Sequence, residues 1–111
     1  MYGDPRHIPS DTLKGYRASI LRPGRAQNVL TALRKWQTDI DSLRSIIPQV
    51  KIPTLLVWGT NDKAVDPRSA DALRQHLPQS ELKLIPGAGH LPFEEAPQQF
   101  TDAVLEFLSR N

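Results

Sequence analysis

The stretch TLLVWGTND, residues 54–62, decides how this sequence of 111 residues folds. Its first five residues form an unbroken apolar run that ends at Gly59. A run of this kind is typical of a parallel strand that is buried on both faces. We therefore predict a strand over residues 54–58, with the polar loop that contains Asp62 leaving its carboxyl end.

Helix and strand patterns alternate after this first strand. Asp66 is a good N-cap before a proline at the first helical position, and the helix that it opens ends at Pro78. Residues 81–85 form the second predicted strand, and residues 97–108 carry the clearest amphipathic stripe in the chain. The order strand, helix, strand, helix predicts an α/β fold with a parallel pair joined by a right-handed crossover.

The sequence before the first strand reads as helix. Residues 10–20 have helical spacing, with Ser10 as the expected N-cap, and the turn at residues 22–24 ends that helix. A second helical pattern runs over residues 29–47. We therefore divide the chain into a helical segment, residues 1–47, and an α/β segment, residues 48–111.

The charge is unevenly distributed between these halves. Residues 1–51 carry nine Lys and Arg against four Asp, whereas residues 52–111 carry five basic and eight acidic side chains. A basic half is one sign of nucleic-acid binding. No aromatic interleaving or helix-turn-helix pattern accompanies it, so we expect these cations on the solvent faces of helices and no nucleic-acid partner.

Composition excludes several further classes. The chain has no cysteine, which excludes disulfides and thiolate metal sites. No apolar run approaches the ~20 residues that a membrane span needs. Met1 is followed by a polar, proline-containing stretch and not by a signal peptide. We expect a cytoplasmic protein with no membrane partner.

Two loops leave the carboxyl ends of the predicted strands, and ligands bind at such ends in parallel sheets. One loop carries Asp62 and the other, residues 86–90, carries His90. A carboxylate that accepts from one ring nitrogen of a histidine leaves the other nitrogen free to take a proton. Asp66 is the competing acid, although its position as a helix cap already explains it.

Each of these residues also has a plain structural interpretation. A loop histidine beside glycine is often a surface turn residue, and Asp62 after Asn61 is a good turn former. Trp36 and Trp58 fit packing better than substrate binding. The residue types alone leave these alternatives open.

Three segments resemble the α/β-hydrolase superfamily: IPTLLVWGTND at residues 52–62, IPGAGH at residues 85–90 and EAP at residues 95–97. The resemblance implies that Asp62 is the acid and His90 the general base of a nucleophile-His-acid triad. It implies a structural role for Glu95. Residues 1–47 are similar in style to the end of the helical cap in epoxide hydrolases, haloalkane dehalogenases and related esterases.

The sequence departs from that family at the nucleophile. The family needs a G-x-S-x-G elbow, or its Asp version, and none occurs here. We expect the C-terminal portion of a longer hydrolase acting on an ester, epoxide or similar small substrate, needing no metal or organic cofactor and inactive alone. The alternative is a non-catalytic truncated homologue that acts as an oligomerisation or binding module.

The predicted strand over residues 54–58 would also lack the neighbour that precedes it in the family fold. Its free edge would offer unpaired amides and carbonyls to another chain. We therefore expect a homo-oligomer, or association with the missing N-terminal part of the hydrolase.

Overall fold

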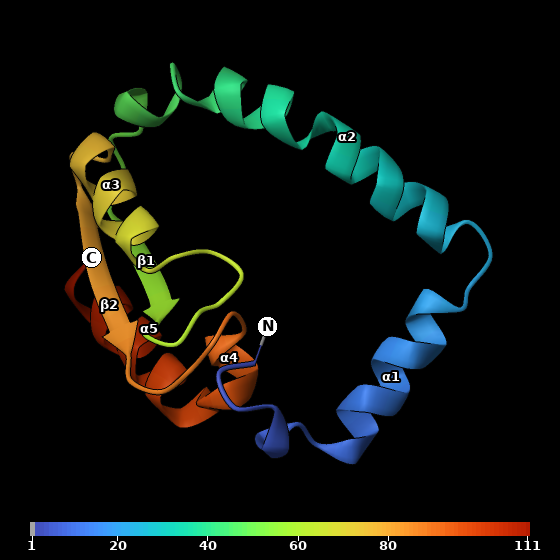
Figure 1. Ribbon diagram of the computed structural model, residues 1–111. Coiled ribbons are helices and arrows are strands. Elements are labelled where there is room, and N and C mark those ends of the chain that lie inside the picture. The colour runs from blue at the N-terminus through green and yellow to red at the C-terminus, as the bar shows by residue number, and fades with distance from the viewer. Residues whose placement is uncertain (1) are drawn as a thin grey trace.

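The computed structural model describes residues 2–111 and contains a helical first half followed by an α/β second half (Figure 1). The first half contains the short 3-10 helix η1 (Pro5–His7), α1 (Ser10–Ile20), α2 (Arg25–Leu43) and the 3-10 helix η2 (Ile47–Gln49). The second half contains β1 (Thr54–Gly59), α3 (Arg68–His76), β2 (Ser80–Ile85), α4 (Pro92–Glu95) and α5 (Pro97–Arg110). The predicted α/β class is confirmed.

The two strands pair in parallel, as the strand-helix-strand order predicts. The register runs from Thr54 opposite Ser80 to Gly59 opposite Ile85. Both strands are one residue longer than predicted, because β1 includes Gly59 and β2 begins at Ser80. The matched register brings the carboxyl ends of β1 and β2 to the same level, where the two site loops begin.

The expectation that β1 is buried on both faces is wrong for this chain. Residues 54–58 are only half-buried, and Gly59 alone is buried. Helices α3, α4 and α5 contact the strand, but among residues 2–111 the sheet contains only β1 and β2. The small core that does form holds Ala70, Leu77, Ile85, Ala88 and Ala103.

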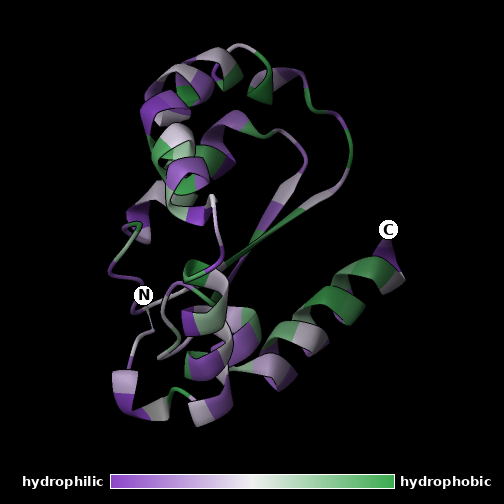
Figure 2. Cartoon of the chain, turned by 90° about the vertical axis from the view of Figure 1, so that its right-hand side faces the viewer, coloured by the Kyte–Doolittle hydropathy of each residue, from purple (hydrophilic) through white to green (hydrophobic). Residues whose placement is uncertain are grey.

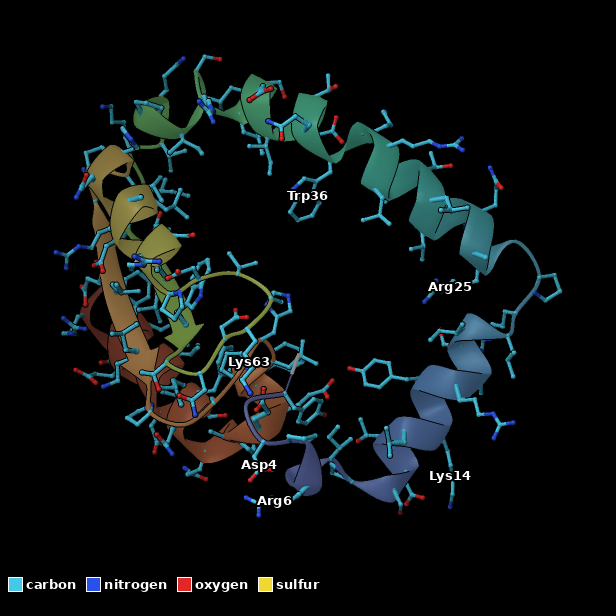
Figure 3. All side chains as sticks on the ribbon, viewed as in Figure 1. Asp4, Arg6, Lys14, Arg25, Trp36 and Lys63 are labelled. Carbon is cyan, nitrogen blue, oxygen red and sulfur yellow. The ribbon has the colours of Figure 1, made fainter. Side chains whose placement is uncertain are left out.

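Helices α1 and α2 arch away from the sheet (Figure 1). Neither helix has a buried residue. The radius of gyration is 16.1 Å, against about 13 Å for a compact domain of this length. Trp36 points from α2 toward the inner side of this arch and is 59% exposed (Figure 3).

Further apolar side chains stay in contact with solvent on other elements. Helix α5, which ends at the label C in Figure 2, is hydrophobic over much of its second half. Leu105 and Leu108 in that half are exposed. The amphipathic stripe predicted for this helix exists, but its burial is incomplete because the sheet beneath it is narrow.

Local details differ from the sequence prediction at three points. Ser10 is the first residue of α1 and makes no capping hydrogen bond, because Pro9 occupies the cap position. Helix α3 starts at Arg68, one residue after the predicted proline, and Asp66 Oδ1 accepts the Arg68 N–H at 2.9 Å. The short helix α4 was not predicted.

Within the part of the chain that the structure describes, no helix has both the length and the apolar character that a membrane crossing requires.

Candidate active site

The loops that follow β1 and β2 run side by side and are hydrogen-bonded to each other. The Thr60 N–H donates to the Ile85 carbonyl at 3.1 Å, and the Asn61 N–H donates to the Ala88 carbonyl at 2.9 Å. In return, the Gly87 N–H donates to the Thr60 hydroxyl at 2.9 Å. These bonds fix the two loops together at the carboxyl edge of the sheet, as the topology predicts.

Gly59 permits this close approach of the loops. A Cβ at this position would lie 2.1 Å from the Gly89 carbonyl oxygen and 2.3 Å from that of Ala88. Gly87 has φ of +77°, a left-handed conformation that favours glycine. The glycines of both loops therefore let the backbone carrying His90 lie directly across the end of β1.

Asp62 and His90 meet at this edge. The Nδ1 of His90 lies 2.9 Å from Oδ2 of Asp62. The Asp62 side chain is 4% exposed, whereas that of His90 is 36% exposed. The acid is thus buried behind an imidazole that remains accessible to solvent.

The second carboxylate oxygen of Asp62 is held by its own loop. Its Oδ1 accepts from the Ala64 N–H at 2.8 Å and from the Val65 N–H at 3.0 Å. Both oxygens therefore have partners, and the carboxylate is fixed in orientation before any ligand arrives.

These contacts also determine the charge of Asp62. Its burial acts to raise the pKa, but hydrogen bonds from the Val65 N–H, from His90 and from the Ala64 N–H together hold the pKa below its ordinary value. An ionised Asp62 can only accept, so the Nδ1 of His90 carries the proton in this contact. In the neutral tautomer that carries its proton on Nδ1, the Nε2 is free to accept a proton.

Asp66, the competing acid, faces a different partner. Its carboxylate pairs with the Arg68 guanidinium at 2.6 Å and accepts the Arg68 N–H. The side-chain hydrogen bond from Arg68 is the main reason that the pKa of Asp66 falls to about 2. The geometry therefore brings Asp62, and not Asp66, to His90.

A small hollow of about 170 Å³ opens beside the pair. Trp58, Pro92 and the backbone of Gly89 are among the groups that line it, together with Asp62 and His90. Trp58 also donates its indole N–H to the Val65 carbonyl at 3.2 Å, which ties the Asp62 loop to β1. In residues 2–111 no group of three or more His, Cys, Asp or Glu side chains is arranged to hold a metal ion.

Five contacts around this site were not predicted. Glu94 accepts from the hydroxyl groups of Tyr2 and Tyr16, the latter at 2.7 Å. Glu95 accepts from the N–H groups of Gly89 and Leu91, on either side of His90, and from that of Gly3. The motif EAP marks Glu95 in the sequence, but no local pattern indicates which amides it binds, because one of them lies in the N-terminal segment.

The fold matches a known family. The family model for the alpha/beta hydrolase fold matches residues 11–97, which is most of the chain. The chain therefore belongs to the α/β-hydrolase fold family.

Several relatives of this chain are esterases and lipases. It is 41% identical over 86 residues to the pimeloyl-[acyl-carrier protein] methyl ester esterase of Nitrosomonas europaea, a match that covers 76% of this chain and 33% of the relative. A solved thermophilic esterase from Thermogutta terrifontis is 35% identical, covers 61% of this chain and 25% of its own, and superimposes with a TM-score of 0.60.

A third comparison extends over nearly the whole chain. A putative lipase from Acinetobacter baumannii AYE superimposes with a TM-score of 0.74 over 99% of this chain and 40% of its own, at 21% identity. That likeness concerns the fold alone. The chain spans a third or less of the length of the curated relatives that it matches first.

Proposed function

We propose that this chain supplies the acid and the base of a carboxylic-ester hydrolase, with Asp62 as the acid and His90 as the general base. The observation that carries the proposal is the 2.9 Å contact between the His90 Nδ1 and the buried Asp62 carboxylate. Similarity to the Nitrosomonas europaea methyl ester esterase favours an ester over an epoxide or a halide.

In this mechanism the unprotonated Nε2 of His90 takes the proton of a nucleophilic hydroxyl as that hydroxyl attacks the ester carbonyl. Asp62 stabilises the imidazolium that forms and keeps its Nδ1–H in place. The imidazolium then returns the proton to the leaving alcohol. Water repeats the cycle and releases the acid.

We propose that the nucleophile of this mechanism is not one of these 111 residues. The chain has seven serines, and none is flanked by glycine at both two-residue offsets: Ser10, Ser19, Ser42, Ser45, Ser69, Ser80 and Ser109. A triad without an activated nucleophile does not form the acyl intermediate. We propose that the chain alone is inactive, and that residues 1–47 form the end of a cap over the completed site.

The test is a chimera that provides the rest of the fold. The matching segment of the Nitrosomonas europaea esterase, 86 residues long, is replaced by the corresponding segment of this chain. We expect the chimera to hydrolyse p-nitrophenyl butyrate, and His90→Ala to reduce kcat by about 10⁴-fold. A folded chimera without turnover, or one in which His90→Ala is fully active, would contradict the proposal.

A second candidate function is self-association without catalysis. The observation that favours it is the free edge of β1, since within residues 2–111 this strand pairs with β2 only. Strand β2 carries the charged residues Glu81 and Lys83, which disfavour pairing of its free edge with another chain. Strand β1 carries no charged residue. We propose that two copies of the chain pair through their β1 edges.

A further inference from the structure

Glu95 binds the backbone on both sides of His90. Its Oε2 accepts the Gly89 N–H at 3.0 Å, and its Oε1 accepts the Leu91 N–H at 3.2 Å. These are the two amides that flank the histidine. One carboxylate therefore spans the residue that carries the imidazole.

A third hydrogen bond reaches Glu95 from the N-terminal segment. The Gly3 N–H donates to Oε2 at 2.7 Å. Gly3 lies so close to the loop that a Cβ there would be 2.5 Å from the Gly87 carbonyl oxygen. The segment that carries Gly3 therefore packs against both the Glu95 carboxylate and the loop that carries His90.

Glu95 is itself fixed in position by α4. Its N–H donates to the Leu91 carbonyl at 2.9 Å, while its side chain accepts from the Leu91 N–H. The next residue, Ala96, donates to the Pro92 carbonyl at 2.9 Å. These backbone bonds fix the position of Glu95, so its carboxylate is held next to the loop.

The hydrogen bonds of the loop change partners at Ala88. Its bonds to the β1 loop end at Ala88, whose carbonyl accepts from Asn61. Beyond Ala88, the Glu95 carboxylate binds the Gly89 and Leu91 N–H groups, and His90 contacts Asp62. The Leu91 carbonyl also accepts from the backbone N–H groups of Glu94 and Glu95. Loss of the Glu95 carboxylate would remove the side-chain acceptor of both amides that flank His90.

We propose that Glu95 is a positioning residue that clamps the histidine loop and so keeps the His90 Nδ1–H directed at Asp62. The significance of the clamp for catalysis rests on the proposed function of His90. Glu95 acts through the backbone and touches neither the imidazole nor the reacting atoms.

A purely structural role for Glu95 would be to stabilise α4 and nothing more. The two roles differ in their effect on the tautomer of His90, because only the clamp connects Glu95 to the Asp62 contact. Glu94→Gln is the matched control. It removes the same charge from the adjacent residue, but Glu94 binds tyrosine hydroxyls and none of the loop amides.

The experiment is NMR on the ¹⁵N-labelled 111-residue chain at pH 8, with the His90 ring signals assigned from the spectrum of His90→Ala. We expect the wild type and Glu94→Gln to hold His90 as the Nδ1–H tautomer. In Glu95→Ala this preference should be lost, and the amides of Gly89 and Leu91 should exchange with solvent at least 10-fold faster. Exchange of the β1 and β2 amides reports whether each variant remains folded.

An unchanged His90 tautomer in a folded Glu95→Ala would overturn the proposal. If Glu95→Ala unfolds, the His90 tautomer is measured in Glu95→Gln instead. Glutamine keeps one acceptor oxygen and has nearly the same size as glutamate. We then expect a partial loss of the Nδ1–H tautomer, and a wild-type tautomer would again overturn the clamp. Failure of the ester-hydrolase proposal is detected in a different experiment. It would appear as a chimera that keeps its esterase activity when His90 is replaced by alanine.

Discussion

The Asp62 carboxylate links the stability of this protein to pH. Its pKa is held below the ordinary value of about 3.9, since hydrogen bonds from Val65, His90 and Ala64 outweigh the effect of burial. The unfolded chain therefore binds a proton at a higher pH than the folded chain does. The stability that Asp62 provides is complete above its unfolded pKa and is lost as the pH falls through its folded pKa.

We expect Asp62→Asn to flatten the acid side of the stability profile. The free energy of unfolding, measured by urea denaturation between pH 5.5 and pH 3, should fall more steeply in the wild type than in the variant. Parallel profiles for the two proteins would mean that the carboxylate is not held by these hydrogen bonds in solution.

Tyr2 gives a second prediction, on the alkaline side. Its hydrogen bond to Glu94, its burial and the negative charge of Glu94 raise the pKa of Tyr2 to about 12. Tyr16 is shifted in the same direction, chiefly by its own hydrogen bond to Glu94. The stability that the Tyr2 hydroxyl contributes is therefore complete below its pKa in the unfolded chain, about 10. It is lost as the pH rises through its pKa in the folded chain, about 12.

The measurement is the absorbance of ionised tyrosine at alkaline pH in the folded chain, which has two tyrosines. In Glu94→Gln both phenols should ionise at lower pH than in the wild type, because the shared acceptor charge is gone. Identical titration curves would show that neither hydroxyl donates to Glu94.

At this residue scale the sequence predicted part of the site. Parallel strands bring their following loops together, so Asp62 and His90 were predictable as neighbours from topology. The contacts of Glu95 were not, because its partners Gly3 and Gly89 depend on how the N-terminal segment packs against the histidine loop.

At the scale of the elements, β1 and the loop that carries His90 pack closely at Gly59. We expect Gly59→Ala to lower the free energy of unfolding by about 1–3 kcal/mol, because the added methyl group would overlap the Gly89 and Ala88 carbonyl oxygens. Gly15→Ala is the control, since a Cβ at Gly15 meets nothing within 4 Å. It lies inside α1 and should stabilise that helix by about 0.5–1 kcal/mol.

Urea denaturation of both variants measures these changes. A Gly59→Ala protein as stable as the wild type would mean that the loop does not lie across the end of β1.

The sequence predicted that the helices and strands of the second half exist and in what order, since apolar runs and helical spacing are local signals. The short helix α4 is the exception. The burial of β1 was mispredicted, because it depends on neighbours that residues 2–111 do not provide.

In the molecule as a whole, many apolar side chains of α1, α2 and the two-stranded sheet stay in contact with water. Leu30, Leu33 and Trp36 on α2 are all exposed. We expect light scattering at micromolar concentration to give the mass of a dimer of the 12.5 kDa chain. The paired β1 edges would place Leu56 in the contact between copies.

Leu56→Lys should therefore convert the dimer to a monomer by placing a charge in that contact. The control is Leu84→Lys, which adds the same charge to β2 at a position that is already exposed and should leave the dimer intact. A wild-type monomer, or dissociation by Leu84→Lys and not by Leu56→Lys, would contradict pairing through β1.

The most direct test of the central claim compares two acids in the esterase chimera. We predict that Asp62→Asn lowers kcat for p-nitrophenyl butyrate by about 10⁴-fold, because His90 loses the partner that sets its tautomer. Asp66→Asn should change kcat little, since Asp66 pairs with Arg68 and not with His90. Full activity in Asp62→Asn, or an equal loss in Asp66→Asn, would contradict the assignment of Asp62 and His90 as the acid and base.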